Sequence, residues 1–146
     1  MSLGTSSVEG PLSVIANIKA ERDWPRAVVM LAIYLEKHSY LAVREHFEFL
    51  KDKIDNKEHW KAMQESLERL HLLDYGLTLL SAEKIDSDEF YTMKCINIVR
   101  NNWVHRKEKY RYKIGTEAKE EYLPLLERGE RLLAKLFITE VHIFRR

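Results

Sequence analysis

Residues 23–53 read DWPRAVVMLAIYLEKHSYLAVREHFEFLKDK, with no glycine and no proline after Pro25. Asp23 is a favourable N-cap residue, and Pro25 falls in the first helical turn, where its missing N–H is harmless. Apolar residues then recur mostly every three or four positions, the spacing of one face of an α-helix. The stretch therefore predicts a long helical segment, in which the less apolar residues 37–40 could hold a kink or break. The apolar positions are Val28, Leu31, Leu35, Leu41, Val43, Phe47 and Leu50.

The same spacing continues on both sides of this stretch. A short apolar stripe occupies residues 11–21, and a longer one occupies residues 58–80, where Gly76 is expected to interrupt or bend the helix. Asp86 and Glu89 have the spacing of a capping box, in which an N-cap side chain and the side chain three residues later cap the helix start reciprocally. A further helix is therefore predicted to begin there.

A last helix is predicted from Thr116, with Pro124 expected to kink or restart it. Five glycines and three prolines are too few for the many turns of a β-sandwich or barrel, and no run alternates like a strand. The sequence thus predicts an all-α, up-and-down bundle of four to five helices. We expect one domain over residues 11–146, after a disordered segment or cloning remnant at residues 1–10.

Composition limits the function classes. A formal net charge of +1 gives no global field, so attraction to nucleic acid must come from a local patch. The single cysteine, Cys95, excludes an internal disulfide and suits a reducing compartment. The longest apolar run, residues 27–35, is far shorter than the roughly 20 residues that span a bilayer. We therefore expect a cytoplasmic protein without membrane contact.

No metal or cofactor is predicted. The histidines are scattered, and no two lie four residues apart. Glycine-rich phosphate loops and serine-nucleophile elbows are absent from the sequence. Four acidic residues are interpreted as solvated helix faces, any of which could instead support His105. They are Glu45, Glu48, Glu65 and Glu68.

Residues 100–105, RNNWVH, place three chemically useful side chains late in the predicted helix. Asn101 and His105 are four residues apart and share a face, whereas Arg100 is offset from His105 by about 140°. Histidine acts as a general acid or base near neutral pH, and arginine offers a fork that matches phosphate. Asn101 could orient the imidazole or bind a ribose hydroxyl. The simpler interpretation is a polar helix end, where the helix dipole favours Arg and His.

The pattern Arg100-Asn101-three residues-His105, late in a small helical chain, resembles the signature of the HEPN superfamily. Those helical-bundle domains include metal-independent endoribonucleases, many of them toxin or antiviral proteins, marked by arginine, four to six residues, and histidine. The resemblance covers this motif and a compatible helix layout. One branch of the family, paired with minimal nucleotidyltransferases, has a tyrosine two positions after the histidine. Lys107 stands there in this chain, so the resemblance does not extend to that pairing.

The resemblance implies a homodimer in which two motif helices face each other around one phosphodiester. Arg100, Asn101 and His105 are then the catalytic residues, and the 140° offset no longer separates them because each chain contributes to a shared site. The implied reaction is attack of the ribose 2′-OH on the adjacent phosphate. It leaves a 2′,3′-cyclic phosphate and a 5′-hydroxyl, needs no metal, and spares DNA. RNA is the implied substrate, and an antitoxin protein a possible partner.

A basic segment follows the motif. Residues 100–113 hold six basic residues and one acidic residue, a local formal charge of +5, with two tyrosines between the charges. This mixture suits a surface that follows phosphates and stacks on bases, although an ordinary solvated loop has similar composition. The residues predicted to contact RNA are Arg106, Lys107, Lys109, Tyr110, Arg111, Tyr112 and Lys113.

The competing hypothesis is a non-catalytic helical module that binds RNA, a nucleotide or a protein partner. Catalysis requires Arg100 and His105 to be exposed in a shared cleft. The competing hypothesis is favoured if His105 is buried in its own core, or if Arg100 is held in a salt bridge far from any groove.

Overall fold

The computed structural model describes residues 9–105 and 116–144, with the side chains of 104–105, 116–118 and 138–144 left outside the description. Six α-helices and one 3₁₀ segment make up this part of the chain, in which no strand occurs. The all-α bundle is thus confirmed. The helices are α1 (Glu9–Ala20), α2 (Trp24–His46), α3 (Lys57–Glu68), α4 (Leu72–Ser81), α5 (Ser87–His105) and α7 (Thr116–Phe144), and η2 (Glu48–Lys53) is the 3₁₀ segment.

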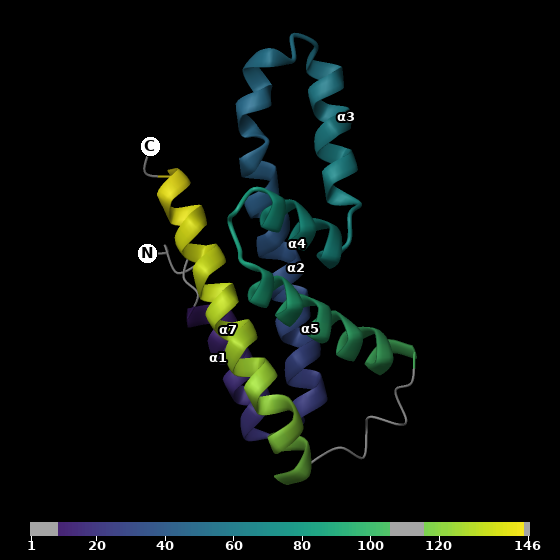
Figure 1. Cartoon of the computed structure of the whole chain (residues 1–146), viewed down its shortest axis with the longest axis vertical. Coiled ribbons are helices and arrows are strands. Elements are labelled where there is room, and N and C mark those ends of the chain that lie inside the picture. Colours follow the sequence, from purple (N-terminus) through teal and green to yellow (C-terminus); the bar gives the residue numbers. More distant parts are fainter. Residues whose placement is uncertain (1–8, 106–115, 145–146) are drawn as a thin grey trace.

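Helix α2 is the centre of the bundle. Twelve of its 23 residues are buried, and α1, α4, α5 and α7 all pack on it (Figure 1). The side chain of Asp23 accepts a hydrogen bond from the N–H of Arg26 at 3.3 Å, so the predicted cap is confirmed. Burial on several sides explains the uninterrupted apolar run at residues 27–35.

The break that residues 37–40 could hold is absent, because α2 continues through them to His46. His38 and Ser39 are buried there, and the imidazole of His38 packs on the Phe137 ring of α7 with centroids 4.1 Å apart. His38 and Ser39 therefore face the core, Lys37 is exposed, and the helix does not end there. The chain leaves the α-helix only after His46, where η2 begins.

The predicted interruption at Gly76 is wrong. The helix over residues 58–80 is instead divided at Arg69–His71, between α3 and α4, and Gly76 lies inside α4. A Cβ at this glycine would stand 2.7 Å from Sδ of Met93 on α5. Gly76 thus allows α4 and α5 to pack closely. This division also raises the number of helices above the predicted four to five.

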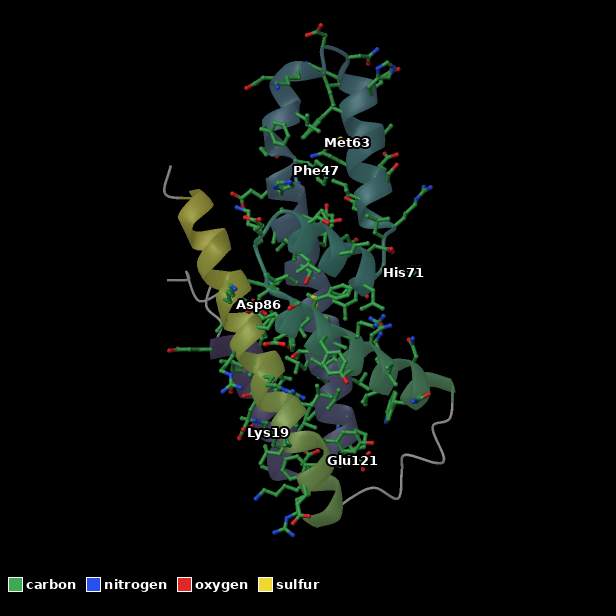
Figure 2. All side chains as sticks on the ribbon, viewed as in Figure 1. Lys19, Phe47, Met63, His71, Asp86 and Glu121 are labelled. Carbon is green, nitrogen blue, oxygen red and sulfur yellow. The ribbon has the colours of Figure 1, made fainter. Side chains whose placement is uncertain are left out.

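The end of α2, η2 and α3 form an arm that projects from the bundle (Figure 1). No residue from Arg44 to His71 is buried, although the segment contains many apolar residues. Phe47 and Met63 lie between the two limbs of this arm (Figure 2). The side chains of Trp60, Met63 and Leu67 are therefore only half-buried, and of the three Leu67 packs against the core.

Helix α7 runs through Pro124 as a single helix, so the predicted restart is wrong. Farther along, Gly129 is buried where α7 crosses α2 and α5. A Cβ at Gly129 would overlap the Leu31 side chain of α2 and stand 2.8 Å from Cδ1 of Ile96 on α5. The absence of a side chain at Gly129 thus permits the close contact of these three helices.

No helix in the described residues is long and apolar enough to cross a membrane.

We predict that Gly129→Ala destabilises the fold. Alanine is favoured over glycine in a helix by about 1 kcal/mol, but overpacking a dense core costs about 1–3 kcal/mol. The net loss in the free energy of unfolding, measured by chemical denaturation, should therefore lie above zero and at most about 2 kcal/mol. Gly10→Ala is the control, because an added Cβ there meets no atom within 4 Å. A Gly129→Ala variant that is stabilised would contradict this packing.

Candidate functional site

Helix α5 carries the motif and begins as the sequence predicts. The Asp86 N–H donates to Oε1 of Glu89 at 2.9 Å, and the Glu89 N–H donates to Oδ1 of Asp86 at 2.8 Å. This capping box fixes the start of the helix. Its last residue is His105, whose side chain lies outside the described part of the structure.

Arg100 faces α2. Its Nη1 lies 2.7 Å from Oε2 of Glu36, and its Nη2 donates to Oδ1 of Asn97 at 2.9 Å. The Arg100 side chain is 19% exposed and that of Glu36 is 36% exposed, so the ion pair sits at the edge of the helix contact. These contacts fix the direction of two N–H donors of the guanidinium. They also link α5 to α2 near the C-terminal end of α5.

Asn101 lies on a different face of α5 and is exposed. Tyr91 and Ile98 are also exposed, at 59% and 57%. On a helical period, positions 91, 98 and 105 fall within about 40° of one another, and position 101 lies about 60° from 98. The outer face of α5, defined here by Tyr91, Ile98 and Asn101, therefore combines two large apolar side chains with one motif residue. Arg100 is about 160° from Ile98.

Glu36 also lines a surface pocket of about 330 Å³. The pocket lies on α2 where that helix passes the end of α3 and the start of α4. Its walls combine aromatic rings, two carboxylates and an amine. The lining residues are Ile33, Glu36, Lys37, Tyr40, Glu68 and Tyr75. Arg100 therefore contacts a residue of the pocket wall, Glu36, and its ion pair is close to a groove.

Hydrogen bonds hold several walls of this pocket in place. The Tyr40 hydroxyl donates to Oε1 of Glu68 at 3.3 Å, and the Tyr75 hydroxyl donates to the Leu67 carbonyl at 2.5 Å. The two tyrosine rings meet edge to face, with centroids 5.9 Å apart. The C-terminal end of α3 is thereby linked to both α2 and α4.

The pKa values of the two pocket tyrosines are both shifted upward. Burial raises the pKa of the Tyr75 hydroxyl, and the negative charge of Glu36 raises it further. Burial also raises the pKa of Tyr40; Arg44 lowers it and Glu68 raises it, each by a smaller amount. Both hydroxyls therefore remain protonated hydrogen-bond donors at neutral pH.

The seven residues predicted to bind RNA, from Arg106 to Lys113, lie outside the described residues. Glu36, the partner of Arg100, was not anticipated, because its position between Leu35 and Lys37 has no distinctive local signal. Glu68, interpreted from the sequence as a solvated face, lines the pocket.

No group of three or more His, Cys, Asp or Glu side chains that could hold a metal ion occurs in the described part of the chain. Glu68 and His71 have the Glu-x-x-His spacing of the ligand pairs in di-iron bundles. Helix α3 ends at Glu68 and His71 precedes α4, so the two residues do not share a helical face. Cys95 is half-buried against the core, consistent with a packing role.

Comparison of the chain with protein-family models, with curated proteins and with solved structures finds no match.

We predict that the Arg100–Glu36 pair contributes modestly to stability. A double-mutant cycle with Arg100→Met and Glu36→Gln should give a coupling energy of about 0.5–1 kcal/mol, since solvent screens the exposed part of Glu36. The control is the same cycle at Arg26 and Glu21, whose side chains are more exposed and 3.3 Å apart. A coupling no larger than in this control would show that the contact does not hold α5 to α2.

Proposed function

We propose that the chain is a homodimeric, metal-independent endoribonuclease of the HEPN type. The observation that carries the proposal is the outer face of α5, where Asn101 shares a helical face with the exposed Tyr91 and Ile98. Exposed apolar surface that is rimmed by polar residues can mark a protein–protein contact. A second copy covering this face would bring two motif helices together, as the resemblance implies.

The chemistry assigned to each motif residue follows from its side chain. His105 moves protons between the ribose 2′-OH, the leaving 5′-oxygen and solvent. Arg100 stabilises the negative charge that develops on the phosphate, and Asn101 orients the histidine or the ribose. The basic residues after the motif hold the RNA backbone. No cofactor enters this reaction.

Glu36 has a defined place in this scheme. A carboxylate on a guanidinium occupies the fork that a phosphate would otherwise take. In the absence of RNA, the Glu36 contact keeps the guanidinium ordered; the phosphate then replaces the carboxylate on one edge. The proposed setting is cytoplasmic, as a toxin or antiviral protein, with an antitoxin protein as a further partner.

One observation favours a second candidate, a non-catalytic module that binds RNA, a nucleotide or a protein. Arg100 is directed toward α2 and held by two side chains, away from the face that carries Asn101. In that hypothesis, Arg100 has an architectural role and the outer face of α5 binds without cutting. The two hypotheses differ in whether His105 is required for RNA cleavage.

We predict that the purified chain cleaves total cellular RNA in the presence of EDTA and leaves the corresponding DNA intact, because the attacking group is the 2′-OH. His105→Ala should lower the cleavage rate by about 10²–10⁴-fold, the usual contribution of a general acid–base residue. The products, analysed by mass spectrometry, should end in 2′,3′-cyclic phosphates.

The matched control is His59→Ala, since His59 is exposed on the projecting arm. It should cleave like the unmodified chain. RNA that is bound but remains intact would replace the nuclease proposal with the binding module. Cleavage that survives His105→Ala would indicate a contaminating nuclease.

A further inference from the structure

The pocket on α2 has the chemistry of a base-binding site. Its walls supply the side chains of Ile33 and Tyr40 as apolar surface, Glu68 as a hydrogen-bond acceptor and Lys37 as a cation. A volume of about 330 Å³ accommodates one nucleobase with its sugar at the opening. The two carboxylates and the amine on its walls favour a ligand with polar groups over a purely apolar one.

The carboxylates of Glu36 and Glu68 differ in the hydrogen bonds and ion pairs that they already make. Oε2 of Glu36 is engaged by Arg100 at 2.7 Å. Glu68 is exposed at the end of α3, and its Oε1 accepts a long 3.3 Å bond from the Tyr40 hydroxyl. Each carboxylate oxygen can accept more than one hydrogen bond, so Glu68 retains acceptor capacity for a ligand. Glu68 is therefore the carboxylate available to accept hydrogen bonds from a ligand, whereas Glu36 holds Arg100 in position.

A carboxylate discriminates among the bases by their donor patterns. The Watson–Crick edge of guanine presents N1–H and N2–H side by side, and two parallel donors match the two oxygens of one carboxylate. Adenine and cytosine each place an acceptor nitrogen beside their amino group, which a carboxylate repels, and uracil offers one N–H between two carbonyls. Guanine is consequently the base that Glu68 fits.

Two cations lie at the pocket. Lys37 is exposed beside the pocket, and Arg100 contacts Glu36 on its wall. A base seated against Glu68 would place its sugar and phosphate toward these two positive groups. The phosphate would thus approach the guanidinium that the motif supplies.

We infer that this pocket binds the guanine of a guanosine nucleotide, with Glu68 on its Watson–Crick edge, Tyr40 along the ring, and Lys37 and Arg100 toward the phosphate. The inference rests on the proposed function, because it makes this pocket the guanosine-binding site of that nuclease. Binding of the mononucleotide itself does not require catalysis.

The test is a titration of the full-length, isotopically labelled chain with GMP, AMP, CMP and UMP, followed by NMR chemical shifts. GMP should bind at least about tenfold more tightly than the others, the discrimination typical of one bidentate contact. Glu68→Gln should remove this preference, because an amide offers one acceptor and adds a donor. Glu58→Gln is the matched control; it lies on the same helix, about 15 Å away along the axis.

The outcomes separate this inference from the proposed function. Selective GMP binding that is lost in Glu68→Gln and kept in Glu58→Gln supports the pocket, even if no RNA is cleaved. Absent binding, equal binding of all four nucleotides, or a preference unchanged by Glu68→Gln would overturn it, even if His105-dependent cleavage is observed. Circular dichroism of each variant verifies that the helices are intact.

Discussion

The burial of α2 on several sides is the constraint on which the other elements depend. Leu31, Leu35 and Val43 are fully buried, and α1, α4, α5 and α7 all pack on this helix. Close approach requires small residues at the contacts, and Gly129 supplies one on α7. Because protein interiors are packed as densely as crystals, these contacts determine which faces of the outer helices remain exposed.

The position of the candidate site follows from that arrangement. Where α5 crosses α2, Arg100 points toward Glu36, while the opposite face of α5 remains exposed with Tyr91, Ile98 and Asn101. The motif is therefore divided between two faces of one helix. Within one chain this division separates the guanidinium from Asn101. In a dimer formed through the outer face, Arg100 of each copy would stay on the side that faces α2, so its long side chain would have to leave Glu36 to reach a phosphate held between the copies.

Local sequence patterns predicted some parts of this fold well. The caps at Asp23 and Asp86 depend on residues within three positions of each other, and both were predicted correctly. The role of Gly76 was not predicted, because its packing against Met93 on α5 is a contact between helices that no local pattern encodes. Glu36 was missed for the same reason, since its partner lies 64 residues away.

The amphipathic stripe of α3 shows a different limit. Its spacing correctly predicts a helix but does not show whether the apolar face is buried. In this chain, no residue of α3 is buried. The assignment of RNA contacts to residues 106–113 stays a prediction. What the structure adds to the motif is its surroundings: the ion pair with Glu36, the pocket beside it, and the exposed outer face of α5.

The central claim is that a second copy covers the outer face of α5, and sedimentation velocity at micromolar concentration tests it most directly. The unmodified chain should sediment as a dimer, and Ile98→Asp as a folded monomer, because a charge buried without a partner opposes association. Phe49→Asp is the control, since Phe49 is as exposed as Ile98 but lies on the projecting arm; it should remain dimeric. A monomeric unmodified chain, or a dimer unaffected by Ile98→Asp, would contradict the account.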